Sequence, residues 1–430
     1  MTATHLRRAG LGLMLALLLF IGYRAADPGP DPLAEAEAEA HVAAGAYTAA
    51  ERAYRDVLAH RPADPLPALR LAELYSAWDD PTQGQRALDE AIRRGADYAR
   101  WGSLHIRLLA QAGAWEETIE AATAYLAAYP GDETALRALL DAHLHRRECA
   151  AATATAARWL AHAPDNADIA RLHALLSGDS ALLCPNAAPD CDLQWGIAQL
   201  RAGDWPLALC PLERAARAAL DAAQAWTAHA WLGETLARLG HPGPARVHLV
   251  QATRLAPEQP LGWLLLGTYY LGHGAPAEAE DALWEAHQLD PANPATCLLM
   301  GQAQAAAGTY DAIDTWMTAA LERAPRDADI HQAVARFYLT RHLRQGDFPE
   351  RAISGALALA PESAESHLLR GWAELLKNNN EAALSALNTA VAYDPDSGEA
   401  HHLRGQALQR LGRPEEAQAA FTRAADLGYR

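Results

Sequence analysis

The chain has 430 residues, more than a single compact core usually serves, so several domains or a repetitive architecture are expected. Apolar residues make up 50% of the chain and charged residues 21%, which excludes wholesale disorder and a protein with many membrane spans. The 36 basic residues are dispersed among 53 acidic ones and the net charge is -17, so nucleic acid is not an expected partner.

Residues 1–30 predict a membrane-targeting segment. Basic residues up to Arg8 precede the charge-free apolar run 9–23, and acidic residues follow it, so the body of the chain is expected outside the cytoplasm. The run is shorter than the roughly 20 residues of a relaxed spanning helix, which favours a cleaved signal peptide. Cleavage after Ala26, however, would place Arg24 where a small residue is required. We therefore expect a single-pass anchor in the cell membrane, with a secreted protein and a buried cytoplasmic helix as the alternatives.

Small residues and prolines recur along the chain with a period of about 34 residues. The repeated positions include Gly233, Gly267 and Gly301, then Gly371 and Gly405, and also Pro257, Pro291 and Pro325. The clearest unit reads Trp263-x-x-Leu266-Gly267-x-x-Tyr270, then Ala279, Leu283, Ala286 and Pro291. This unit resembles the tetratricopeptide repeat family at every signature position, except that Leu283 stands where the family usually has Phe.

Each repeated position has a physical role in a helical hairpin. Small residues at Gly267 and Ala279 let two antiparallel helices approach closely, and Pro291 ends the second helix because it lacks an N–H. A single hairpin cannot bury both of its apolar faces, so neighbouring copies must stack. The predicted fold class is therefore all-α. The resemblance implies an α-solenoid of about eleven tetratricopeptide-type hairpins that forms a right-handed superhelix.

The spacing of the prolines predicts two arrays of repeats separated by a connector. The N-terminal array is expected at 31–165, a half-repeat connector at 166–188 and the C-terminal array at 189–430. In the connector a single helix is expected from Ala167 to Ser177, with no second amphipathic helix to complete its hairpin.

Five cysteines are too few and too scattered for a disulfide scaffold. Cys184 and Cys191 flank the loop of the connector, where they either close a short disulfide or are two unrelated small residues. Cys149, Cys210 and Cys297 lie in helical pattern and are expected to be packed thiols.

The sequence has none of the motifs for phosphate binding, acyl transfer or zinc, so neither an enzyme nor a cofactor or metal site is predicted. Asp141, His145 and Cys149 share a spacing of four. A hairpin turn is expected near Arg147, however, so we interpret the histidine and the cysteine as structural.

The resemblance implies that residues of each first helix line a concave groove. The expected groove residues are Leu264, Leu271, Leu298, Val334, Tyr338, Leu368 and Trp372, with Arg238 and Arg341 at the rim. The N-terminal part of the groove would be more polar and would include Arg137. The alternative is that the leucines complete the packing between repeats.

These observations predict a non-catalytic protein–protein interaction scaffold that holds a protein or peptide segment in the groove, in envelope assembly or secretion. One alternative is a structural protein that forms a homodimer through the C-terminal repeat, which ends at Arg430 without a polar capping helix. A second alternative is the non-catalytic arm of a sugar-transferring complex.

Overall fold

The computed structural model describes residues 32–179, 190–218, 221–341 and 348–429. Every regular element in these ranges is an α-helix, 23 in all, which confirms the all-α fold class. The predicted targeting segment lies outside the described residues, so the anchor and the signal peptide stay predictions. Within the described ranges, no helix combines the length and the apolar character needed to cross a membrane.

The chain divides into two compact units, Met1–Gln111 and Ala112–Arg430. In the first unit α2 packs against α3, α4 packs against α5, and α6 contacts both α4 and α5. The described helices of this unit are α2 (Pro32–Ala43), α3 (Tyr47–His60), α4 (Leu66–Ala77), α5 (Pro81–Arg93) and α6 (Tyr98–Gln111).

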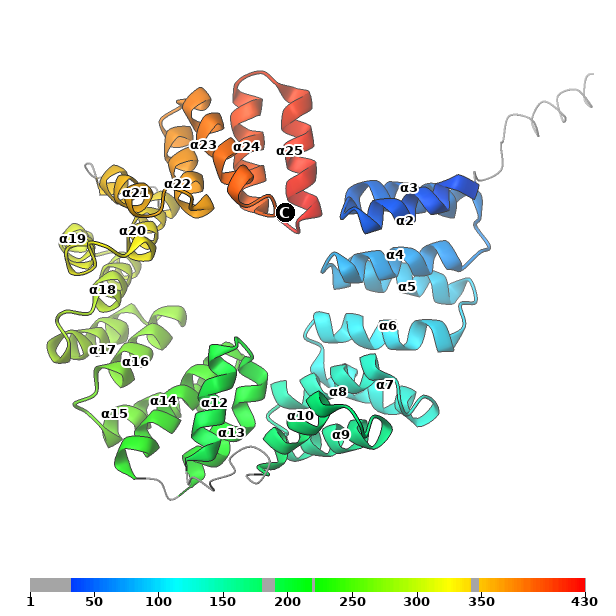
Figure 1. Ribbon diagram of the computed structural model, residues 1–430, viewed down its shortest axis with the longest axis horizontal. Helices are drawn as coiled ribbons and strands as arrows, with labels where there is room; N and C mark the ends of the chain where they lie inside the picture. The colour runs from blue at the N-terminus through cyan, green and yellow to red at the C-terminus, as the bar shows by residue number, and fades with distance from the viewer. Residues whose placement is uncertain (1–31, 180–189, 219–220, 342–347, 430) are drawn as a thin grey trace, which may run out of the picture. The chain divides into compact units, whose positions relative to one another are not determined.

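The second unit contains most of the helical pairs (Figure 1). Its first described helices are α7 (Trp115–Ala128), α8 (Glu133–His145), α9 (Cys149–His162) and α10 (Ala167–Ser177). The hairpins that follow are α12 (Cys191–Arg201) with α13 (Trp205–Arg217), α14 (Ala222–Arg238) with α15 (Pro242–Leu255), α16 (Pro260–Gly272) with α17 (Pro276–Leu289), α18 (Pro294–Ala307) with α19 (Ile313–Arg323), α20 (Ala328–Thr340) with α21 (Phe348–Leu359), α22 (Ala364–Leu376) with α23 (Asn380–Tyr393), and α24 (Gly398–Arg410) with α25 (Pro414–Asp426).

Local sequence signals set the ends of these helices. The side chain of Asn293 caps α18 by accepting a hydrogen bond from the Ala295 N–H, and Pro294 occupies the first helical position. Gly240 lies in the turn between α14 and α15 with a φ of 80°, a left-handed conformation that favours glycine. The chain therefore reverses direction where the repeat pattern requires it.

The repeat glycines lie where the two helices of a hairpin cross. A Cβ atom on Gly267 would lie 2.6 Å from Cγ of Leu283, which is closer than real contacts allow. Glycines and large residues at the same spacing make the same crossing in other hairpins, namely Gly233 with Leu249, Gly301 with Met317, Gly371 with Leu387 and Gly405 with Phe421. The close approach predicted from the small residues is thus confirmed.

Helix α10 interrupts the regular series of hairpins. It has the predicted bounds, begins at the cap Asn166 and ends at Gly178 in the left-handed conformation. It packs against α9 and contacts α13. The connector loop with Cys184 lies outside the described residues, so the pairing of Cys184 with Cys191 and the boundaries of the two arrays stay predictions.

Candidate functional site

Three of the predicted groove residues lie in the hydrophobic core. Val334 is 0% exposed, Tyr338 1% and Leu368 3%. Val334 and Tyr338 lie on α20, which packs against both α21 and α22, and Leu368 lies on α22, which packs against α20, α21 and α23. The Tyr338 ring stacks on Phe348 at 5.9 Å between ring centroids, and its hydroxyl donates to the carboxylate of Asp314. The structure therefore places these three residues in the packing between repeats.

The other apolar groove residues are half-buried. Leu264 and Leu271 pack beside the core of α17 and α18, and Leu298 and Trp372 beside the larger core that follows. These four side chains keep some exposed surface and also contribute to packing. Their role in a groove stays a proposal.

The two predicted rim arginines are exposed and lie over aromatic rings. The guanidinium of Arg238 is 4.2 Å from the centroid of the Trp205 ring, and its Nε donates to Glu234 at 2.7 Å. Arg341 lies 5.5 Å from the ring of Phe337. Both arginines are thus partly engaged within the chain.

A cavity of about 310 Å³ opens between α8, α9, α10 and the first turn of α13. Its lining residues are Glu133, Arg137, Leu140, Asp141, Trp159, Asn166, Asp168, Ile169, Leu172, Asp204 and Leu207. Buried Leu140, Trp159 and Ile169 give it an apolar floor, whereas the exposed residues of its lining are polar. An apolar floor with a few converging polar groups is the usual form of a binding pocket.

The charged groups of the cavity influence one another. Burial raises the pKa of the Asp141 carboxyl to about 6, with Arg137 acting against this shift and Asp204 adding to it. Asp204 also caps α13, because its side chain accepts a hydrogen bond from the Leu207 N–H. The Arg137 guanidinium lies 5.9 Å from the Trp159 ring. The cavity can therefore hold an apolar group and place charged groups at its edge.

The raised pKa of Asp141 predicts a pH-dependent effect of Asp141→Asn. The pKa of Asp141 in the folded protein lies above the ordinary 3.8. The contribution of this carboxyl to stability is therefore fully present below pH 3.8 and is lost as the pH rises through about 6. Asp141→Asn removes this loss, and we expect it to stabilise the protein by about 1–2 kcal/mol at pH 8 and not at pH 3.5. Thermal unfolding of both proteins at the two pH values measures the difference. An equal difference in stability between Asp141→Asn and the wild type at both pH values would contradict a raised pKa for Asp141.

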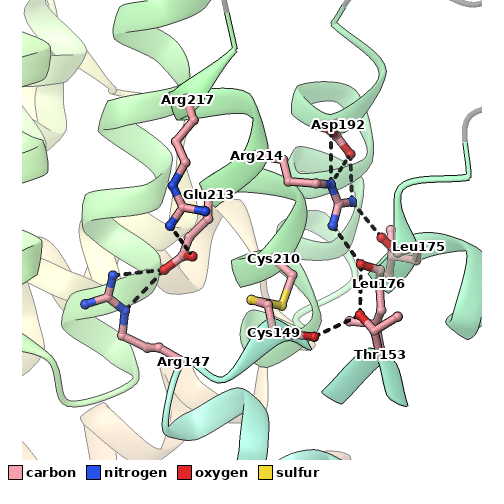
Figure 2. The surroundings of a disulfide bond; sticks show 10 residues. All are labelled: Arg147, Cys149, Thr153, Leu175, Leu176, Asp192, Cys210, Glu213, Arg214 and Arg217. Atoms are coloured by element: carbon pink, nitrogen blue, oxygen red, sulfur yellow. Dashed lines mark hydrogen bonds and ion pairs between the residues drawn. A yellow bond between two sulfur atoms is a disulfide. The ribbon is translucent and has the colours of Figure 1, made fainter. Parts of the chain in front are cut away.

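A disulfide joins two of the helices that border this cavity. Cys149, the first residue of α9, pairs with Cys210 in α13, and their Cα atoms are 5.7 Å apart (Figure 2). The prediction that both are packed thiols is wrong, because the first residue of α9 lies against α13. Cys297 is a buried free thiol, as predicted. A separation of 61 residues gives no signal of this pairing in the sequence.

Two arginine clusters surround the disulfide (Figure 2). Arg214 donates to the backbone oxygens of Leu175 and Leu176 at 2.7 and 2.8 Å and also to Asp192, so it satisfies the last carbonyls of α10. The carboxylate of Glu213 is 7% exposed and accepts from Arg147 and Arg217, each at 2.9 Å. Together they connect α13 to the α8–α9 turn and to α10.

Asp141, His145 and Cys149 do not form a shared site. Cys149 is in the disulfide, the ring of His145 stacks on Trp115 at 4.0 Å, and Arg147 has a φ of 64° in the predicted turn. In the part of the chain that the structure describes, no group of three or more side chains could hold a metal ion.

Comparison with protein families identifies the repeats. Family models described as tetratricopeptide repeat match residues 41–108, 232–294 and 398–428, and one described as TPR repeat matches 371–412. The chain is a tetratricopeptide repeat protein. The suspected resemblance is thus confirmed, and the TPR matches include hairpins of both units.

Solved structures similar to this TPR protein include the Cut9–Hcn1 heterotetramer of the APC/C, with 16% identity, a TM-score of 0.43, and coverage of 94% of this chain and 95% of that one. Yeast Tom70 has 14% identity, a TM-score of 0.40 and coverage of 92% and 91%. A thermophilic TPR protein from Thermus thermophilus has 24% identity, a TM-score of 0.37 and coverage of 44% and 99%. No curated protein sequence matches the chain.

Only some of the residues that line the cavity could be predicted from the sequence. Arg137 was expected in the N-terminal groove, whereas Trp159 and Asp204 were not singled out, because they belong to a second helix and to a turn. The cavity depends on how α13 meets α8 to α10, and the repeat pattern is broken at that place.

Proposed function

We propose that this TPR protein is a non-catalytic scaffold that binds a segment of a protein partner. The observation that carries the proposal is the cavity between α8, α9, α10 and α13, which has an apolar floor and polar groups at its edge. TPR hairpins supply rigid helices on which such a surface can recognise an extended or helical segment. The half-buried groove residues Leu264, Leu271 and Leu298 would extend the binding surface along later repeats.

We propose further that the protein acts outside the cytoplasm, in envelope assembly or secretion. The Cys149–Cys210 disulfide supports this location independently of the N-terminal segment, because structural disulfides persist mainly in oxidising compartments. Membrane anchoring and formation of a homodimer stay predictions.

Site-specific photocrosslinking in cells tests the binding proposal. Leu172 is half-buried in the cavity, whereas its neighbour Arg171 is exposed and does not line the cavity. The photoreactive amino acid p-benzoylphenylalanine is introduced at either position of the full chain. We expect a discrete crosslinked product from position 172 and at least about tenfold less from position 171.

Each outcome of this experiment has a defined meaning. A crosslink to another polypeptide supports the scaffold, and a product with twice the mass of the chain supports self-association instead. Equal products from both positions, or no product from either, would refute binding in the cavity. Thermal unfolding of each variant shows that the fold is intact.

A further inference from the structure

We infer that the Cys149–Cys210 disulfide is a covalent link, releasable by a dithiol reductant, that holds the first turns of α13 beside α8 to α10 and so maintains the shape of the cavity. The inference rests on the proposed function only where it concerns partner binding. Asp204 and Leu207, which line the cavity, lie within two helical turns before Cys210 on the same element. The covalent bond is therefore anchored directly behind one wall of the cavity.

The ion pairs and hydrogen bonds that flank the disulfide and link α13 to the earlier helices lie on one side of Cys210. Glu213 and Arg214, which pair with Arg147 and with the end of α10, both follow Cys210. Leu209, Leu212 and Ala215 along α13 lie in the core of the next hairpins, and Trp205 at its start lies under Arg238 of α14. Without the disulfide, the cavity side of α13 keeps its attachment to α14 but loses its covalent link to α9.

Two further features favour opening on that side. The carboxyls of Asp141 and Asp204 lie on opposite walls and repel each other when both are charged. Pro211 lies inside α13 directly after Cys210 and cannot donate to the carbonyl oxygen of Leu207. A helix that lacks this hydrogen bond can bend there, so its first turns can move while the turns with Glu213 and Arg214 stay in place.

A dithiol reductant can break the Cys149–Cys210 disulfide by thiol–disulfide exchange. Its thiolate attacks the sulfur of half-buried Cys149, because Cys210 is 1% exposed, and the Cys210 sulfur leaves as a thiolate that takes up a proton. The second thiol of the reductant then displaces Cys149 from the mixed disulfide. The products are two protein thiols and one oxidised reductant, so two electrons and two protons pass to the protein.

Amide hydrogen exchange of the intact chain tests the inference without a partner. The variants are Cys149→Ser/Cys210→Ser and, as the matched control, Cys297→Ser, which removes a buried free thiol. We expect the double variant to exchange at least about tenfold faster in α10 and in the first turns of α13, with unchanged protection in α16 and α17. The Cys297→Ser control should leave α10 and α13 as in the wild type.

Unchanged exchange in α10 and α13 would overturn the inference. Loss of protection throughout α12 to α25 would also overturn it, because the bond would then stabilise the whole unit instead of one wall. If the double variant does not fold, brief treatment of the folded wild type with dithiothreitol gives the same measurement.

Crosslinking from position 172 separates this inference from the proposed function. If both are correct, the product falls at least about fivefold in the Cys149→Ser/Cys210→Ser background. If the double variant exchanges faster but the oxidised protein gives no crosslink, partner binding in the cavity is refuted and the inferred role of the disulfide is supported. If the double variant gives a normal crosslink and unchanged exchange, the inferred role of the disulfide is refuted and partner binding is supported.

Discussion

Tyr338→Ala should destabilise the second unit by about 3–5 kcal/mol, because the variant leaves a cavity in the core between α20, α21 and α22. The tyrosine hydroxyl also donates to Asp314, so the variant leaves that carboxylate without this donor. Urea titration of the intact chain, combined with amide exchange in α20 to α22, measures the loss. A change below about 1 kcal/mol would contradict a core position for this residue.

Two matched variants separate the parts of this effect. Tyr338→Phe keeps the ring and removes only the hydroxyl, so about 0.5–1.5 kcal/mol should be lost. Trp372→Ala truncates a half-buried ring on α22, the first helix of the following hairpin. It should lower the free energy of unfolding by less than Tyr338→Ala, although the side chain is larger. If Trp372 contacts a partner, capture of that partner should fall while unfolding changes little.

Glu213→Gln is expected to cost about 2–4 kcal/mol, because it removes the negative charge from a buried ion-pair cluster while keeping the volume of the side chain. The side chain of Arg147 is only 28% exposed and would keep its charge without an anion beside it. The free energy of unfolding from urea titration, measured with the disulfide intact, gives the value.

Arg217→Ala is the control for this cluster. Arg217 contacts the same carboxylate, but its side chain is 72% exposed, so its removal should cost at most about 1 kcal/mol. Equal losses in Arg217→Ala and Glu213→Gln would show that burial of the carboxylate does not determine the effect.

The hairpins could be predicted from the sequence because the residues that form one hairpin are close together in the chain. Gly267 meets Leu283 within a single repeat, so the 34-residue pattern contains both partners of the contact. The same reasoning correctly predicted α10, where the cap Asn166 and the left-handed Gly178 give local signals for both ends.

Features that depend on how successive hairpins meet could not be predicted in this way. Whether Tyr338 faces a groove or the next repeat depends on packing against Phe348, which lies outside its own helix. The pairing of Cys149 with Cys210 depends on how α13 packs against α8 and α10, where the repeat pattern is interrupted. The cavity depends on the same packing and was therefore only partly anticipated through Arg137.

Some contacts of the chain lie within one hairpin and others join separate hairpins, and this difference determines where the chain can gain or lose repeats in evolution. When recombination duplicates or deletes the block α16–α17, it carries Gly267 and Leu283 together, so the crossing of the helices survives. Arg214 and the disulfide instead join α13 to residues of α9 and α10. A repeat inserted between α10 and α13 would separate all these partners at once, so this segment must be inherited as a single block.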